Sequence, residues 1–161
     1  DLSTYKIIHF ATHGEISGAI AGINEPFLVL SPPTGSSTED GLLTMSEIMS
    51  LDTNANLIVL SACNTASGDE AGSEGFSGLA KSFFMSGSKS VLVSNWYVET
   101  YSAKELVINL FKNLKDNPNS SISNGLNMTM LNMSKNEKDR SHPMFWAPFV
   151  VVGKNEPLFF R

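Results

Sequence analysis

Several features that mark particular protein classes are scarce in this chain of 161 residues. It has one cysteine, which excludes an internal disulfide and is typical of a reducing compartment. No apolar run approaches the roughly 18 residues of a membrane span, and no basic segment with an apolar core opens the chain. The formal net charge is −5 without a dense Lys/Arg block, which argues against nucleic-acid binding. We expect a single cytoplasmic globular domain without membrane binding.

Patterns for metals and common cofactors are also missing. The three histidines and the one cysteine include no pair with zinc-ligand spacing. No G-x-G-x-x-G follows a first strand, and no phosphate loop ending in Gly-Lys-Ser/Thr is present. The stretch Gly75-Phe-Ser-Gly-Leu79 lacks the final glycine of a serine-hydrolase elbow. We therefore expect neither a metal nor a cofactor.

Short apolar runs alternate with segments of helical periodicity. The runs predict strands at 5–11, 27–30, 57–61, 90–94 and 149–152, with a short edge strand near 40–43. The periodic segments predict helices at 45–51, 75–86, 101–115 and about 120–134. Because several strands are apolar throughout, they predict a mostly parallel sheet covered on both faces, which is an α/β fold in one domain over residues 1–161.

Local signals refine this outline. Thr44 and Glu47 have the spacing of a capping box, which places a helix start there. The segment from Thr12 to Pro26 is expected to turn out of the first strand and continue as a loop. In the last helix, Met128 and Leu131 widen the apolar face, so we expect them in the core.

Two strand ends carry the residues that suggest chemistry. Cys63 follows the buried strand 57–61, and His13 follows the strand 5–11. If these strands are parallel neighbours, both side chains emerge at the same edge of the sheet, where an imidazole can take the proton of a thiol. Gly14 lets the backbone approach a substrate closely, and its N–H could join that of Cys63 in an oxyanion hole.

Simpler interpretations of these residues stay open at this point. Free cysteines are among the most buried residues, so Cys63 could be a structural thiol. His13 could be an ordinary loop histidine at the end of a strand. His9 and His142 compete with it as the base, although His9 lies inside a strand and His142 precedes a proline in a turn.

Six segments together resemble the CHAT domain of the caspase-like (clan CD) cysteine peptidases, which are related to separase and the caspases. They occur in family order and cover nearly the whole chain: His9-Phe-Ala-Thr-His-Gly14, Asp40-Gly-Leu-Leu-Thr-Met-Ser-Glu-Ile48, Leu57-Ile-Val-Leu-Ser-Ala-Cys-Asn-Thr-Ala66, Gly75-Phe-Ser-Gly-Leu-Ala80, Ser90-Val-Leu-Val-Ser-Asn-Trp96 and His142-Pro-Met-Phe-Trp-Ala-Pro-Phe149. The resemblance implies a caspase-like three-layer α/β/α sandwich.

The resemblance also implies roles for individual residues. His13 would be the general base and Cys63 the nucleophile, with oxyanion donors at the backbone of Gly14 and Cys63. His9 and His142 would be structural. Candidates for the substrate pocket are Asp40, Asn64, Trp96 and Glu99. The implied partners are a protein or peptide substrate and an activating partner or an upstream repeat domain.

The chain departs from the family pattern in two places. Family members usually carry further strands before the His-Gly strand, so we expect this chain to be the C-terminal catalytic part of the domain. Relatives commonly place Asp residues after the position of Trp96, where only Glu99 could bind a basic side chain here. A substrate with an acidic side chain at the cleavage site would need an arginine in the pocket that binds it. The two arginines, Arg140 and Arg161, lie outside the dyad motifs.

The sequence thus predicts a cysteine endopeptidase that hydrolyses a protein substrate through a Cys–His dyad and a thioester. The alternative is a catalytically inactive or regulatory CHAT module that acts in protein–protein interaction.

Overall fold

A four-stranded sheet forms the centre of the molecule. The structure is a computed structural model, which describes residues 1–32, 40–61, 72–136 and 139–158, with the backbone alone at 72–77 and 136. The strands follow the order β1 (Ile7–Phe10), β5 (Leu57–Leu60), β6 (Ser90–Ser94) and β7 (Phe149–Gly153). The first three are parallel, and β7 runs antiparallel to β6. The expected mostly parallel sheet is therefore confirmed.

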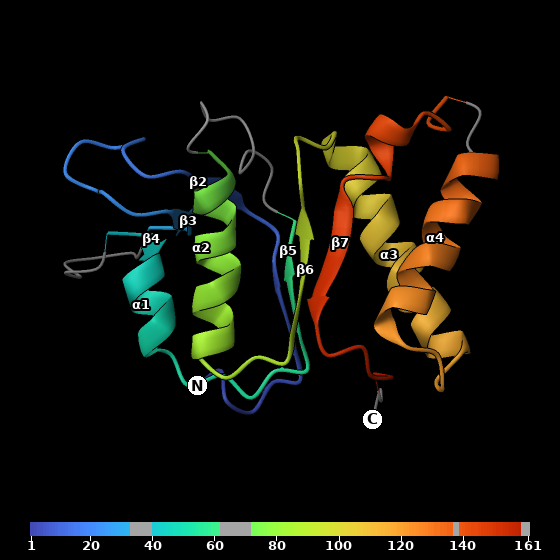
Figure 1. Cartoon of the computed structure of the whole chain (residues 1–161), viewed down its shortest axis with the longest axis horizontal. Coiled ribbons are helices and arrows are strands. Elements are labelled where there is room, and N and C mark those ends of the chain that lie inside the picture. Colours follow the sequence, from blue (N-terminus) through green and yellow to red (C-terminus); the bar gives the residue numbers. More distant parts are fainter. Residues whose placement is uncertain (33–39, 62–71, 137–138, 159–161) are drawn as a thin grey trace.

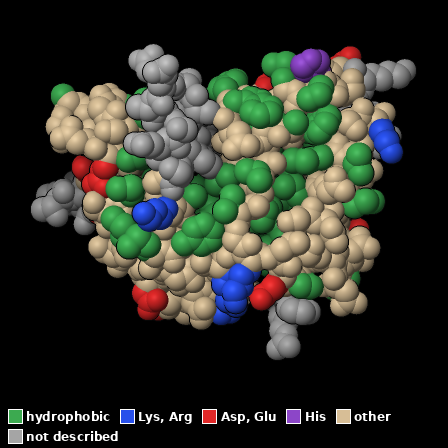
Figure 2. All heavy atoms as spheres, viewed as in Figure 1, with side chains coloured by type: hydrophobic (Ala, Val, Ile, Leu, Met, Phe, Trp, Pro, Cys, Tyr) green, Lys and Arg blue, Asp and Glu red, His purple; other side chains and the backbone are tan. Residues whose placement is uncertain are grey.

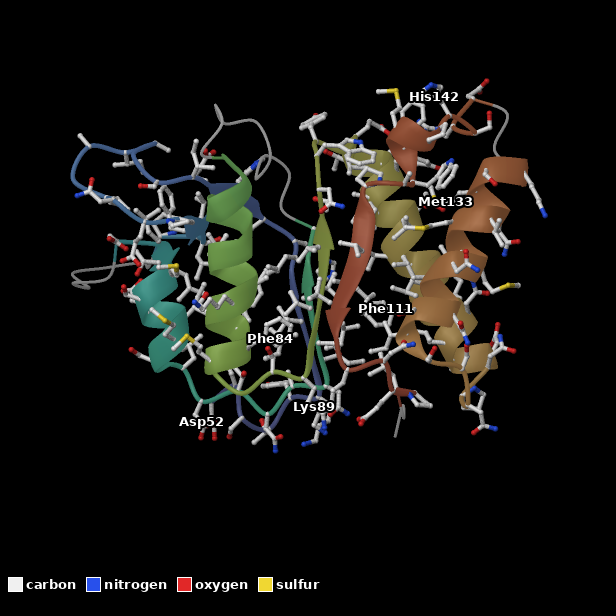
Figure 3. The ribbon with its side chains drawn as sticks, viewed as in Figure 1. Asp52, Phe84, Lys89, Phe111, Met133 and His142 are labelled. Carbon is white, nitrogen blue, oxygen red and sulfur yellow. The ribbon has the colours of Figure 1, made fainter. Side chains whose placement is uncertain are left out.

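Helices cover both faces of this sheet (Figure 1). On one side lie α1 (Met45–Ser50) and α2 (Gly72–Met85), and on the other side lie α3 (Thr100–Asp116) and α4 (Ile122–Asn136). Two apolar clusters fill the two interfaces. In Figure 3, Phe84 extends from α2 and Phe111 from the opposite layer, one in each cluster. This is the three-layer α/β arrangement that the sequence predicts, and it is compatible with a caspase-like fold.

The period of two in an extended strand divides β5 between the two layers. Leu57 and Val59 belong to the cluster with α3 and α4, whereas Ile58 and Leu60 belong to the cluster with α2. All four side chains are buried. A strand that is covered on both faces must be apolar at every position, which is why the sequence shows an uninterrupted run here.

A second, smaller sheet lies beyond the end of β1. It consists of β2 (His13–Glu15), β3 (Phe27–Val29) and β4 (Leu42–Thr44), paired antiparallel in that order. The expectation of a turn and loop directly after Thr12 was therefore wrong for His13–Glu15. Three residues centred on a glycine show no apolar alternation, and they become a strand because β3 offers an edge to pair with.

The predicted capping box at the start of α1 is confirmed, whereas the predicted apolar face of α4 is too wide. Thr44 and Glu47 form the expected capping box at the start of α1. The expectation that Met128 and Leu131 belong to the core was wrong, because they are 54% and 42% exposed. Each lies two residues, or about 200°, from a buried residue of α4, so it points to solvent when that neighbour points inward.

The remaining elements complete the described chain. A 3₁₀-helix, η1 (Pro143–Phe145), connects the α4 region to β7, and Ser121 forms an isolated bridge with Pro157. Figure 2 shows hydrophobic side chains gathered on the face where β7 lies, between α2 and the α3–α4 pair. In the part of the chain that is described, no helix is both long and apolar enough to cross a membrane.

Candidate active site

The carboxyl ends of β1 and β5, which precede the two predicted catalytic positions in the sequence, lie at the same edge of the sheet. The strands pair in parallel, with Phe10 beside Leu60, and the Ser61 N–H donates to the Phe10 carbonyl at 3.3 Å. His13 is three residues beyond Phe10, and Cys63 is three residues beyond Leu60. Cys63 and Asn64 lie outside the described residues. The assumption of parallel neighbouring strands is thus confirmed, while the catalytic roles stay predictions.

His13 sits on the short strand β2, opposite Val29 of β3. Its side chain is exposed, whereas Gly14 is buried opposite Leu28. The Thr12 hydroxyl donates to the carbonyl of Val29, which ties the link between the two sheets to β3. His13 is therefore carried by a paired strand rather than by a free loop, and its backbone position is set by β3.

A second histidine lies close to the same edge. Nε2 of His9 is 2.8 Å from Oγ of Ser61, and this hydroxyl also lies 3.4 Å from the Phe10 carbonyl. His9 is an exposed residue, but its ring stands against Ser61 in the groove, and this partial desolvation lowers the pKa of His9. The ring is therefore neutral at pH 7, and it connects β1 to a residue that precedes Cys63 by two positions. Sequence analysis assigned His9 a structural role but missed Ser61, although both occupy the same face of paired strands.

A groove of about 950 Å³ runs along α3 from this edge. One wall is formed by His9, Ala11 and His13, with Ser61 at its base. The other wall is a stripe of α3 that begins at Thr100 and ends at Lys115. Tyr97, which follows β6, also lines the groove. The groove therefore joins the predicted catalytic edge to a long helical surface.

The four pocket candidates have different surroundings. Trp96 is 42% exposed just beyond β6, and its neighbour Tyr97 is among the residues that line the groove. Asp40 is exposed, and its Oδ1 accepts a hydrogen bond from the Leu42 N–H at 2.8 Å, at the start of β4. Asn64 is not described. The role of these residues in a substrate pocket stays a prediction.

Glu99 is already engaged by protein groups. It caps α3: its carboxylate accepts from the Ser102 N–H at 3.1 Å and from the Ser102 hydroxyl at 2.7 Å. Nε of Arg140 lies 3.3 Å from the same carboxylate, and its guanidinium stands 4.3 Å over the Tyr101 ring. The hydrogen bond from the Ser102 side chain and the nearby Arg140 lower the pKa of Glu99. A basic substrate side chain would have to share this carboxylate with Arg140.

His142 lies apart from the groove, at the start of η1 near the top of Figure 3. Its Nδ1 accepts from the Met144 N–H at 3.2 Å, which makes it the cap of that turn. Across the described ranges, no three His, Cys, Asp or Glu side chains gather in a way that could hold a metal ion. His9 and His13 both line the groove, whereas His142 does not, and His13 follows Phe10 at the same offset as Cys63 follows Leu60.

Comparison with known proteins assigns the family. The sequence model of the CHAT domain matches residues 1–154. Two curated proteins of the same name are similar to this chain: tetratricopeptide repeat protein 28 of Mus musculus is 31% identical over 117 residues, and that of Homo sapiens is 28% identical over 117 residues. In each case 73% of this chain is aligned, and the chain spans about 5% of the length of these relatives. The chain belongs to the CHAT domain family.

Proposed function

We propose that this protein is a cysteine endopeptidase in which Cys63 is the nucleophile and His13 the general acid–base. The observation that carries the proposal is the register of β1 and β5, because His13 and Cys63 follow paired residues at the same offset of three. Membership of a family of caspase-like peptidases supports it. We further propose that the protein acts in the cytoplasm on a protein or peptide substrate.

The proposed reaction has two halves. The thiolate of Cys63 attacks the scissile carbonyl carbon, a C–S bond forms, and the oxygen becomes negative until the C–N bond breaks. The imidazolium of His13 gives its proton to the leaving amine. Water then attacks the thioester while His13 takes one of its protons, and the Cys63 thiolate leaves. Backbone N–H groups of Gly14 and Cys63 are the proposed oxyanion donors.

Labelling with a peptide that carries a cysteine-alkylating group tests the dyad directly. We expect labelling at Cys63, no labelling in Cys63→Ala, and a rate lower by a factor of about 10² or more in His13→Asn, as for loss of a general base. His142→Asn is the matched control, because that histidine is exposed and caps η1 away from the groove. If Cys63 stays unlabelled in the presence of every activating partner tried, the peptidase proposal fails.

A second candidate function is a regulatory CHAT module that binds partners without turnover. The relatives favour it, since both are named as tetratricopeptide repeat proteins and the match covers only about 5% of their length. Stacked repeats form extended binding surfaces, so a repeat region is a suitable activating or docking partner. A crystal structure of the protein with a peptide bound in the groove separates the two functions. Packing of Cys63 in the core, far from His13, would favour the regulatory module.

A further inference from the structure

Three contacts join Ser61, at the carboxyl end of β5, to the neighbouring strand β1. The Ser61 N–H donates to the Phe10 carbonyl at 3.3 Å. The Ser61 hydroxyl lies 3.4 Å from the same carbonyl and 2.8 Å from Nε2 of His9. The place where the chain leaves β5 toward Cys63 is therefore fixed against the strand that leads to His13.

The contact between His9 and Ser61 follows from the register of the two strands. His9 pairs with Val59, and Ser61 is two residues further along the chain. Side chains two residues apart lie on the same face of a strand, and both Ile7 and Val59 face the cluster with α3 and α4. The imidazole of His9 and the hydroxyl of Ser61 share that face. Because both belong to neighbouring paired strands, their contact does not depend on what covers the groove.

The position of Ser61 confines the position of Cys63. Two residues of chain span at most about 7 Å, so a thiol two residues after a fixed point has few places to lie. Proton transfer between a thiol and an imidazole needs a separation of about 2.6–3.2 Å. A misplacement of about 1 Å at a reacting group is enough to lower a rate strongly. Small shifts of Ser61 would therefore matter at the predicted dyad.

The His9–Ser61 contact is compatible with each protonation state of the ring. A neutral ring with a free lone pair at Nε2 accepts the proton of the Ser61 hydroxyl. A ring that carries a proton at Nε2 donates it to the hydroxyl oxygen, and the hydroxyl then donates to the Phe10 carbonyl. A contact that persists in this way suits a residue that holds its neighbour in place.

Given the proposed Cys63–His13 dyad, on which this role depends, we propose that His9 is a positioning residue. Through Ser61 it fixes the point where the chain leaves β5, and it thereby holds the Cys63 thiol within reach of His13. His9 itself touches neither the substrate nor the reacting atoms. The two histidines of one segment then have separate tasks: His13 transfers the proton, and His9 sets the position of its partner.

Alkylation of the intact 161-residue chain by iodoacetamide tests this role. Cys63 is the one cysteine of the sequence, so the rate of alkylation reports on its thiolate alone. The rate is measured from about pH 5 to about pH 10, because an imidazole beside the thiol extends its reactivity below the ordinary thiol pKa of about 8.5. We expect a midpoint at least one pH unit lower than that value, and His13→Asn should bring it back to about 8.5.

His9→Asn and His9→Gln form a matched pair. Both amides are neutral and polar, but only glutamine has a nitrogen as many bonds from Cα as Nε2 of histidine. Loss of one neutral hydrogen bond corresponds to about a tenfold effect, so His9→Asn should raise the midpoint by about one pH unit. His9→Gln should restore the midpoint of the unmodified protein. Neither variant titrates at this position, so equal midpoints for the two variants would overturn the proposal.

Ser61→Ala tests whether His9 acts through Ser61. It should raise the midpoint by about one pH unit, and His9→Asn should add nothing in that background, because the two residues act as a unit. Ser90→Ala is the matched control, since its hydroxyl joins β6 to the Asn56 carbonyl at the opposite end of the strands. An equal shift in Ser90→Ala, or additive shifts in the double variant, would refute positioning through Ser61.

The same measurements separate this role from the dyad on which it depends. If His13→Asn leaves the midpoint of the unmodified protein unchanged, the dyad fails and the role of His9 fails with it. If His13→Asn raises the midpoint and His9→Asn does not, the dyad stands and the positioning role alone is overturned. Circular dichroism of each variant shows that the compared proteins are folded.

Discussion

Replacement of Gly125 by alanine tests how tightly α4 holds α3, the helix that forms one wall of the groove. Gly125 is buried on α4. A Cβ at this position would lie 2.6 Å from Cδ2 and 2.9 Å from Cγ of Leu114, on α3. Ordinary contacts between carbon atoms are about 3.5–4.0 Å. Since Leu114 is only 1% exposed, its side chain has little room to move away.

Two opposing terms determine the result. Alanine is favoured over glycine inside a helix by about 0.8–1 kcal/mol. Overpacking of a well-filled core costs about 1–3 kcal/mol. Because two carbons of one buried side chain are involved, we expect the packing term to exceed the helical term. Gly125→Ala should therefore lower the free energy of unfolding by about 1 kcal/mol, measured by urea titration with circular dichroism.

The same substitution in a Leu114→Ala variant tests whether the contact with Leu114 causes the loss of stability. Leu114→Ala alone should cost about 2–5 kcal/mol, and it removes the two closest atoms that the new methyl group would meet, which leaves Cδ1 of Leu110 at 3.4 Å. Gly125→Ala should then stabilise the variant by about 1 kcal/mol, so its effect changes sign. The difference between Asn127→Gly and Asn127→Ala, at an exposed position of α4, measures the gain in helix propensity without the contact. Stabilisation of the unmodified protein by Gly125→Ala, or equal effects in both backgrounds, would refute the close-packing argument.

Two further predictions concern groups at the site and at the first helix. Because burial lowers the folded-state pKa of His9 below its ordinary value of 6.5, its contribution to stability is complete above that pH and is lost as the pH falls. His9→Asn should therefore reduce the difference between urea midpoints at pH 8 and pH 5, and an unchanged difference would contradict the argument. Thr44→Ala removes the capping box of α1 and should cost about 1 kcal/mol in the same titration. Ser50→Ala, on the same helix, is its control, and an equal loss there would mean that the cap contributes nothing specific.

The parts of the fold that local chemistry decides were predictable from the sequence. The runs at 57–61 and 90–94 became β5 and β6, because strands covered on both faces must be apolar at each position. The pairing of β1 with β5 was assumed from the two strand ends, and the structure confirms it. The short strand β2 was not predictable, because it depends on an edge that β3 supplies from residues farther along the chain.

Contacts between distant residues were outside the reach of sequence patterns. Arg140 pairs with Glu99, which is 41 residues earlier in the chain. No periodicity connects a helix cap to a turn after the next helix. The α3 groove was missed for a related reason. The lysines at 104, 112 and 115 look like an ordinary solvated face until the structure shows that they line the groove with His9 and Ala11.

The His9–Ser61 hydrogen bond links the groove to the predicted catalytic edge. The strength of this bond limits how much binding in the groove can change the reactivity of Cys63. The ring of His9 lines the groove and reaches Ser61, two residues before Cys63. An occupant of the groove that contacts His9 therefore acts on the segment before Cys63 through the His9–Ser61 contact. A neutral hydrogen bond contributes about 0.5–1.5 kcal/mol, so this route alone can change the reactivity of Cys63 by about tenfold at most. A much larger activation by a partner would require movement of β5 itself or contacts made directly at His13.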